Sequence, residues 1–150
     1  MSILKKEVSD IHSLVLKASL VLQESYDRAC LFGIKNEYDL DEKIEIEALT
    51  ARFARMSDLI TQKLLRSILI ILKEPSELVI DRINKSAKYG IIENDIKMLE
   101  IRDLRNEIAH EYIPDEIDKI YIKVFELTPV LLSEIKNISS YIQSNPQLFN

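Results

Sequence analysis

The sequence predicts an all-α fold, an up-and-down helical bundle built as a single domain over residues 1–150. Only two glycines and four prolines occur among the 150 residues, whereas apolar residues make up 47% and charged residues 30% of the chain. Because turns depend on Gly and Pro, their scarcity favours long helices over a turn-rich β fold. A chain of this length forms one domain by the usual prior and can bury about 68–70% of its unfolded surface.

Hydrophobic periodicity and helix-breaking residues predict two long helices in the first half of the chain. The first runs from Ile3 to Phe32 and stops at Gly33, because glycine readily adopts the left-handed conformation that ends helices. After the linker "IKNEYDLD", the second runs from Glu42 to Leu72 and opens with acidic residues that suit the positive end of the helix dipole. Pro75 is expected to end it.

A short helix and a longer one are predicted next. Ser76 is the expected N-cap of the short helix, which stops at Tyr89–Gly90. Asn94 or its neighbour is expected to cap the fourth helix, which extends from Asp95 to Tyr112.

The fifth predicted helix follows Pro114, which disfavours helix at the residue before it. It runs from Asp115 to Ser144, with a candidate kink at Pro129. The connectors between successive helices are short, so sequential helices should pack antiparallel. About five helices are therefore expected in the bundle, an architecture that by itself specifies no activity.

The single cysteine, Cys30, excludes an internal disulfide and a zinc site built on cysteines. Its neighbours Ala29 and Leu31 are apolar, so it is expected to be a small buried hydrophobe in a protein of a reducing compartment. The N-terminus "MSILKKEVSD" lacks the apolar core of a signal peptide, and no apolar run approaches the ~20 residues of a membrane span. These features predict a soluble, cytoplasmic protein with no membrane association.

The net charge of −5 and the sequence pI of about 5.1 argue against a general affinity for nucleic acid, DNA included. Such affinity comes from Lys and Arg that neutralise phosphates, so contact with RNA would have to use a local basic patch.

The stretch "RDLRNEIAHEY", residues 102–112, concentrates polar groups on one helix. At about 100° per residue, Ile101, Leu104 and Ile108 fall within an arc of about 60° and form the core-facing stripe. Away from this stripe lie five polar side chains: Arg102, Asn106 and His110 along one ridge, and Arg105 and Tyr112 on the other flank. Glu107 and Glu111 point toward the side where solvent is expected. Spacing alone fits an ordinary solvated face as well as it fits a site.

The stretch "RNEIAHEY" resembles the R-x4-6-H signature of HEPN domains. Its form, Arg-Asn-x-x-x-His-x-Tyr, is typical of the HepT-like toxins in HEPN–MNT (minimal nucleotidyltransferase) toxin–antitoxin pairs. The match covers Arg105, Asn106, His110 and Tyr112 on a late helix of an all-α chain of about the right length. The resemblance implies a type VII-like toxin, a metal-independent endoribonuclease without cofactors that cuts RNA, tRNA for example, in a cleft between two protomers.

These residue types suit the implied chemistry. RNA carries its own nucleophile, the 2′-hydroxyl, so a proton-transfer group and a cation near the phosphate are enough and no metal is needed. His110 could act as general base or general acid, and Arg105 could bind the phosphate oxygens and stabilise the growing charge. Asn106 would orient the phosphate or His110, and Arg102 is either a substrate contact or surface charge.

The helical positions of Arg105 and His110 favour a homodimer as the active unit. The two side chains lie about 140° apart and about 7.5 Å along one helix axis, too far apart to grip one small group unaided. A two-fold dimer would bring two copies of each side chain to a shared cleft, as the resemblance also implies.

Tyr112 is the implied site of regulation. The resemblance implies that a partner nucleotidyltransferase antitoxin attaches AMP to this tyrosine and so silences the nuclease. Tyr112 lies on the Arg105 flank about two turns further on, so the anionic AMP could pair with Arg105 in place of RNA phosphate. Without the resemblance, Tyr112 would be interpreted as a half-buried tyrosine that caps the core.

A basic stripe is predicted on the second helix, where five cations fall within about 80° of one another and the only acid from Ala51 to Lys73 is Asp58. The stripe is a candidate track for the RNA backbone, or alternatively a solvated face or a docking surface for an acidic partner. Its members are Arg52, Arg55, Lys63, Arg66 and Lys73. His12 has no second His or Cys at ligand spacing, so no metal site is expected there.

Two other functions remain open from the sequence. One is a non-catalytic HEPN bundle that binds a nucleotidyltransferase partner or its substrate. The other is an unrelated helical adaptor in which the motif is accidental.

Overall fold

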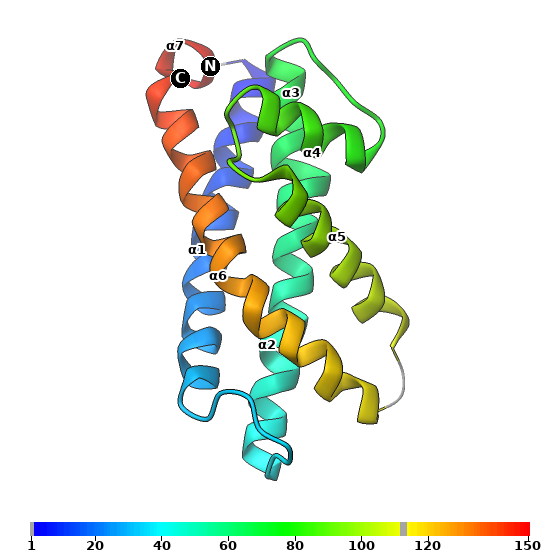
Figure 1. Ribbon diagram of the computed structural model, residues 1–150. Coiled ribbons are helices and arrows are strands. Elements are labelled where there is room, and N and C mark those ends of the chain that lie inside the picture. Colours follow the sequence, from blue (N-terminus) through cyan, green and yellow to red (C-terminus); the bar gives the residue numbers. More distant parts are fainter. Residues whose placement is uncertain (1, 112–113) are drawn as a thin grey trace.

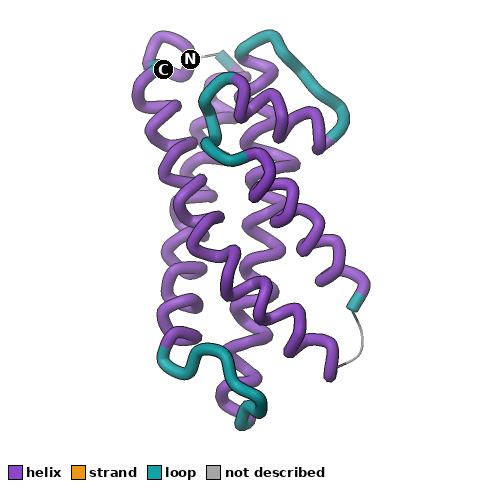
Figure 2. Tube along the Cα trace, viewed as in Figure 1, coloured by secondary structure: helices purple, strands orange, loops and turns teal. Residues whose placement is uncertain are grey.

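The computed structural model describes residues 2–111 and 114–150, and within these ranges all regular structure is helical (Figure 2). The three longest helices, α1 (Ile3–Cys30), α2 (Leu40–Asp58) and α6 (Pro114–Ser144), run along the long axis and pack against one another (Figure 1). α1 and α2 run in opposite directions, and α6 returns toward the end of the molecule that holds both termini. The all-α prediction is confirmed.

At the corner between α1 and α2 the predicted stop at Gly33 is confirmed, whereas α2 starts at Leu40, two residues before the predicted Glu42. α1 ends at Cys30, and Gly33, with φ 63°, donates its N–H to the Ala29 carbonyl at 2.7 Å. Asp39 is the N-cap of α2 and forms a capping box, in which the Asp39 side chain accepts from the Glu42 N–H and the Glu42 side chain accepts from the Asp39 N–H, both at 2.9 Å. The buried Tyr121 of α6 donates its hydroxyl to the Gly33 carbonyl at 3.1 Å, which ties this corner to the core.

The predicted second helix consists of three segments. After α2, residues Leu59–Leu64 form a π-helical segment, η1, followed by α3 (Leu65–Ile71). The Leu65 N–H donates to the Ile60 carbonyl, five residues back, as in a π-helix. α3 ends ahead of Pro75, because Lys73 takes the left-handed conformation with φ 63° and the Glu74 N–H donates to the Leu69 carbonyl at 2.9 Å.

The predicted cap at Ser76 is wrong. α4 (Val79–Lys88) begins after Leu78, whose side chain makes no capping bond. The carbonyls of Ser76 and Glu77 instead accept hydrogen bonds from Arg82, at 2.7 and 3.1 Å, so these residues serve as acceptors for an arginine of α4. The helix ends at Tyr89, and Gly90 has φ 75°, as the sequence predicts.

Two side chains, one local and one from α6, hold the N-terminus of α5 (Asp95–His110) by hydrogen bonds. The Asn94 side chain accepts from the Lys97 N–H at 3.0 Å, which confirms the predicted cap. Glu134 of α6, only 2% exposed, accepts from the N–H groups of Glu93 and Asn94 at 2.9 and 3.0 Å. The carboxylate thus binds α5 to α6 at the point where α5 begins.

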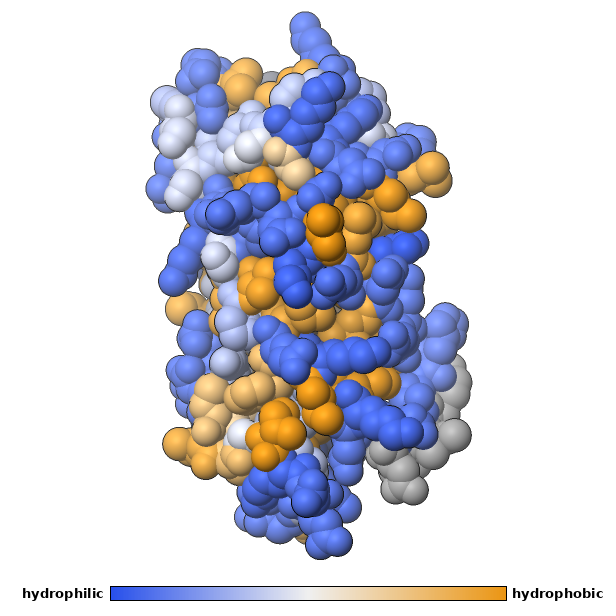
Figure 3. Space-filling model, in the orientation of Figure 1, coloured by the Kyte–Doolittle hydropathy of each residue, from blue (hydrophilic) through white to orange (hydrophobic). Residues whose placement is uncertain are grey.

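The end of the chain continues the bundle. Pro129 lies inside α6 without ending it, and the short helix α7 (Pro146–Phe149) follows with Phe149 buried. Cys30 is exposed, so the prediction that it packs as a buried hydrophobe is wrong. Within the described part of the chain, no helix is both long and apolar enough for a membrane span. Hydrophobic side chains reach the surface among hydrophilic ones on the face that carries α5 and α6 (Figure 3).

Candidate functional site

Helix α5 carries the motif residues and packs against α2, α4 and α6. Ile101 and Leu104 are buried, and Ile108 is partly buried against the core. These are the residues that the helical wheel assigns to the core-facing stripe. The sequence therefore predicts the orientation of α5 correctly.

Arg105 pairs with Asp58, the last residue of α2. The Arg105 Nε donates to Asp58 Oδ1 at 2.7 Å and Nη2 donates to Oδ2 at 2.9 Å, a bidentate geometry in which both bonds are charge-assisted. The two side chains are 34% and 38% exposed, so the pair contributes about 1 kcal/mol or less to stability. The hydrogen bonds with Asp58 raise the pKa of Arg105 further above its usual value.

The ridge of Arg102, Asn106 and His110 lies on the outward side of α5. Arg102 and Asn106 are half-buried, and His110, the final residue of α5, is exposed. Within the described ranges, Arg102 makes only a long contact of 3.5 Å with the neighbouring Asp103. Asn106 and His110 have no hydrogen-bond partner among the residues that the structure describes.

A second ion pair holds the opposite flank of α5. Lys123 of α6 binds both carboxylate oxygens of Glu107 at 3.3 Å. A groove of about 370 Å³ runs along this flank and includes Glu107, Lys123 and Leu104 in its lining. Arg105 therefore faces α2, whereas Glu107 is exposed, as expected, and pairs with Lys123 of α6.

The structure does not bring Arg105 and His110 together within one chain. No hydrogen bond or ion pair connects them in the described ranges, and Arg105 is held toward α2 while His110 ends the helix in solvent. Tyr112, the predicted modification site, lies outside the described residues.

The basic stripe predicted on the second helix is interrupted by η1. Arg52 precedes it, is half-buried and donates to the Ser25 hydroxyl, whereas Arg55, Lys63, Arg66 and Lys73 are exposed. A π-helical segment has more residues per turn than an α-helix, so side chains after it are rotated relative to an α-helical wheel. The five cations therefore do not follow one uniform stripe.

Arg66 approaches a buried cation that the sequence reading missed, Arg82 of α4. Burial lowers the pKa of the Arg82 guanidinium, and the nearby charge of Arg66 lowers it further. Arg82 is 5% exposed and donates to the Thr61 carbonyl of η1 at 3.3 Å and to the Gln62 side chain at 3.4 Å. Arg82 therefore joins α4 to η1, a role that no local sequence pattern indicates.

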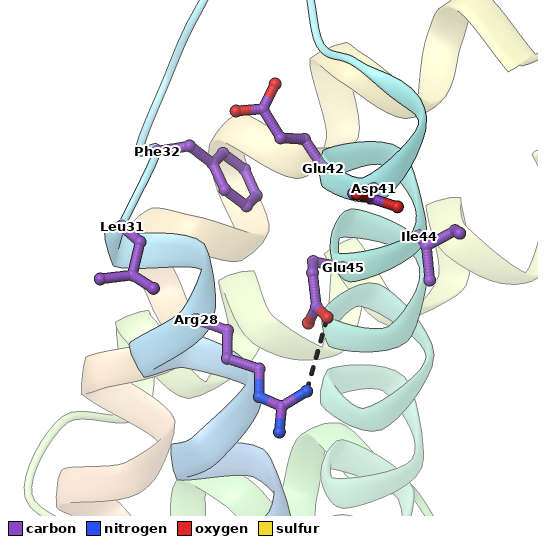
Figure 4. Close-up of a pocket in the computed structure, with 7 residues that line it drawn as sticks. All are labelled: Arg28, Leu31, Phe32, Asp41, Glu42, Ile44 and Glu45. Carbon is purple, nitrogen blue, oxygen red and sulfur yellow. Dashed lines mark ion pairs between the residues drawn. The ribbon is translucent and has the colours of Figure 1, made fainter.

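A cavity of about 430 Å³ lies between the end of α1 and the start of α2 (Figure 4). Its charged lining includes Arg28, which reaches across to Glu45 of α2 at 3.6 Å. None of the motif residues contributes to it, so it forms a separate feature of the molecule. Across the described residues no cluster of three or more His, Cys, Asp or Glu side chains could hold a metal ion.

Asp58 is the site residue that sequence reasoning did not assign. The one available signal was its isolation, since it is the only acid from Ala51 to Lys73. Asp58 and Arg105 are 47 positions apart, so only the packing of α5 on α2 reveals the pair. His12, by contrast, is half-buried and its Nε2 lies 2.8 Å from the Ser139 hydroxyl of α6, in agreement with a packed histidine.

No family model and no curated protein matches the chain.

Proposed function

We propose that this protein is a HEPN-type, metal-independent endoribonuclease that acts as the toxin of a toxin–antitoxin pair. One observation carries the proposal: a single helix presents an arginine anchored by a carboxylate, followed by an asparagine and a histidine that have no hydrogen-bond partner among the described residues. These residues, Arg105, Asn106 and His110, occupy the positions of the R-x4-6-H motif. An anchored cation and an available imidazole are the groups that metal-free cleavage of RNA requires.

In the proposed reaction the RNA 2′-hydroxyl attacks the adjacent phosphorus while the bond from phosphorus to the 5′-oxygen breaks. The products are a 2′,3′-cyclic phosphate and a free 5′-hydroxyl. His110 transfers a proton, either from the 2′-hydroxyl or to the leaving 5′-oxygen. Arg105 stabilises the charge on the non-bridging oxygens, and Asn106 orients the phosphate or His110.

A second copy of the chain completes this site. Arg105 faces α2 and His110 ends α5 in solvent, so one chain alone does not direct both groups at one phosphate. A two-fold axis near α5 would place the arginine of one protomer beside the histidine of its partner. The proposed active unit is therefore a homodimer.

Silencing by a partner nucleotidyltransferase completes the proposed function. Tyr112 follows His110 by two positions, so AMP attached to its hydroxyl would bring a phosphate close to the catalytic groups and compete with RNA. In a co-expressed, neutralised pair, mass spectrometry of the tryptic peptide should show one added adenylate on Tyr112. A neutralised toxin with unmodified Tyr112 would contradict this part of the proposal.

Cleavage of purified tRNA and total RNA in excess EDTA tests the nuclease directly. His110→Ala and Arg105→Ala should each lower the rate by about 10²-fold or more, because each removes a group used in the transition state. Lys97→Ala, a change of an exposed cation on the same helix, should leave the rate unchanged. Circular dichroism melts should show all three variants folded.

Growth of cells that express the protein provides a second, independent test of the nuclease. Expression of the wild-type protein should arrest growth, and His110→Ala should relieve the arrest at equal protein level. A wild-type protein that neither arrests growth nor cleaves RNA would support a non-catalytic binding module instead.

A further inference from the structure

Asp58 meets Arg105 along only one edge of the guanidinium. An arginine carries five N–H donors in a planar fork, and Asp58 receives the Nε–H and one Nη2–H. Among the described residues, no partner takes the Nη1–H donors or the second Nη2–H, and one Nη1–H together with this Nη2–H forms the end-on edge, which is not the edge that faces the carboxylate. The pair therefore leaves a second bidentate face on which a phosphate can bind.

The carboxylate itself stands on a fixed part of the fold. Asp58 is the last residue of α2, and the next residues form η1. Two hydrogen bonds hold Thr61, three residues after Asp58. Arg82 of α4 donates to the Thr61 carbonyl, and the Thr61 hydroxyl donates to the Ser57 carbonyl at 2.8 Å. A return from π-helical to α-helical bonding leaves one carbonyl without its usual helical donor, and Arg82 supplies a donor in this segment.

An unanchored arginine at this position would sample many rotamers. Its side chain carries about 2 kcal/mol of rotamer entropy, and two charge-assisted hydrogen bonds in fixed geometry select one orientation before any ligand binds. Arg105 remains 34% exposed while it is held in this way, so its free edge stays accessible. Asp58 therefore restricts the cation without covering it.

We propose that Asp58 is a positioning residue that fixes the Arg105 guanidinium side-on, so that its end-on edge meets the phosphate as charge develops in the transition state. The inference rests on the proposed nuclease function and assigns a role to a residue outside the motif. A residue that acts by orienting Arg105 affects the chemical step more than ground-state binding, because the benefit lies in preorganisation.

Steady-state cleavage by Asp58→Asn tests the proposal. The amide keeps the size of the side chain, but it offers one acceptor in place of two and removes the charge. kcat should fall between about ten- and a hundredfold, as for other small misplacements of a reacting group, while KM changes by less than about threefold. Glu47→Gln on the same helix is the matched control, since Glu47 is exposed and undergoes the same loss of charge. It should retain the wild-type kcat.

A second readout separates positioning from general stability. In an NMR experiment on Arg side chains, the Arg105 Nε–H should exchange slowly with solvent in the wild-type protein and in Glu47→Gln, and fast in Asp58→Asn. In the Arg105→Lys background, where no side-on fork exists, Asp58→Asn should cause little further loss of kcat.

The outcomes are distinct. An active wild-type enzyme whose kcat is unchanged or raised by Asp58→Asn would overturn the positioning role, and a raised kcat would show that the carboxylate competes with the phosphate. A loss of kcat that is equally large in the Arg105→Lys background would also overturn it. A wild-type protein without any RNA cleavage would instead overturn the proposed function, and with it the role of Asp58.

Discussion

His12 connects two long helices through a single polar contact. It lies half-buried on α1, with its Nε2 at 2.8 Å from the hydroxyl of Ser139 on α6. Burial lowers the pKa of His12 below its usual value of about 6.5, because the charged imidazolium loses hydration in this position. The folded protein therefore binds a proton at His12 less readily than the unfolded chain does.

This difference predicts a loss of stability in mild acid. Above about pH 6.5 the ring is neutral in both states, and as the pH falls toward the folded-state pKa the unfolded chain binds the proton first. The free energy of unfolding should therefore decrease from about pH 7 to pH 5, as measured by urea denaturation at each pH. His12→Gln, which cannot titrate but can still hydrogen-bond Ser139, should show a smaller slope over this range. An identical slope in the variant would exclude His12 as the cause.

Local chemistry explains which single residues the sequence predicts and which it does not. Gly33 and Asn94 were predicted because a left-handed turn and an N-cap each have a preferred residue type. Cys30 and Ser76 were mispredicted because residue type alone specifies neither the exposure of a cysteine nor whether a serine caps a helix or, as here, accepts an arginine through its carbonyl. Asp58 belongs with the second group, since its partner Arg105 lies on another helix.

At the scale of the elements, α5 depends on a buried carboxylate for its position. Glu134 accepts hydrogen bonds from the backbone N–H groups of Glu93 and Asn94 and from the Asn137 side chain at 2.7 Å. Because both N–H groups precede the first turn of α5, Glu134 fixes where the motif helix begins. The placement of the motif residues therefore depends on α6.

Glu134→Gln should destabilise this junction. The glutamine fits the same space, but its NH2 group cannot accept a hydrogen bond, so one part-buried donor loses its acceptor at a cost of about 1 kcal/mol. Urea unfolding should show a lower midpoint, and hydrogen exchange should become faster at Glu93 and Asn94. Glu126→Gln, an exposed position of α6, is the matched control and should unfold like the wild type. Equal midpoints for all three proteins would contradict the capping role.

The π-helical segment explains why the five cations do not form the single track that the sequence predicts. A wheel at a constant 100° per residue treats positions 42–72 as one uniform helix. The structure interrupts this helix at Leu59–Leu64, and no composition signal in those six residues distinguishes them from α-helix. Arg52, before this segment, donates to Ser25 of α1, whereas Arg66, after it, approaches Arg82 of α4.

At the scale of the whole molecule, the divergence of Arg105 and His110 bears on assembly. The single chain holds one group toward α2 and exposes the other at the end of α5. The helical wheel predicted this separation, because it follows from the spacing on one helix. The position of a second copy depends on surface complementarity between chains, which a pattern within one chain does not contain.

The proposed homodimer predicts activity that depends on protein concentration. Specific RNase activity should fall when the protein is diluted below the concentration at which sedimentation shows it to dissociate, because each monomer then lacks half of the site. The nuclease-inactive His110→Ala protein should sediment as the wild type does. A monomer that retains full specific activity would contradict the composite site.

Arg82 couples α4 to η1, so we expect the two segments to open together. Its guanidinium stays charged at any physiological pH and is bonded to neutral acceptors on both the α3–α4 loop and η1. Opening either segment alone would leave the buried Arg82 guanidinium without some of its carbonyl acceptors, at a large cost in free energy. Amide protons of α4 and η1 should therefore exchange with similar opening free energies, as one cooperative unit, and Asp58 would remain anchored as long as that unit stays closed.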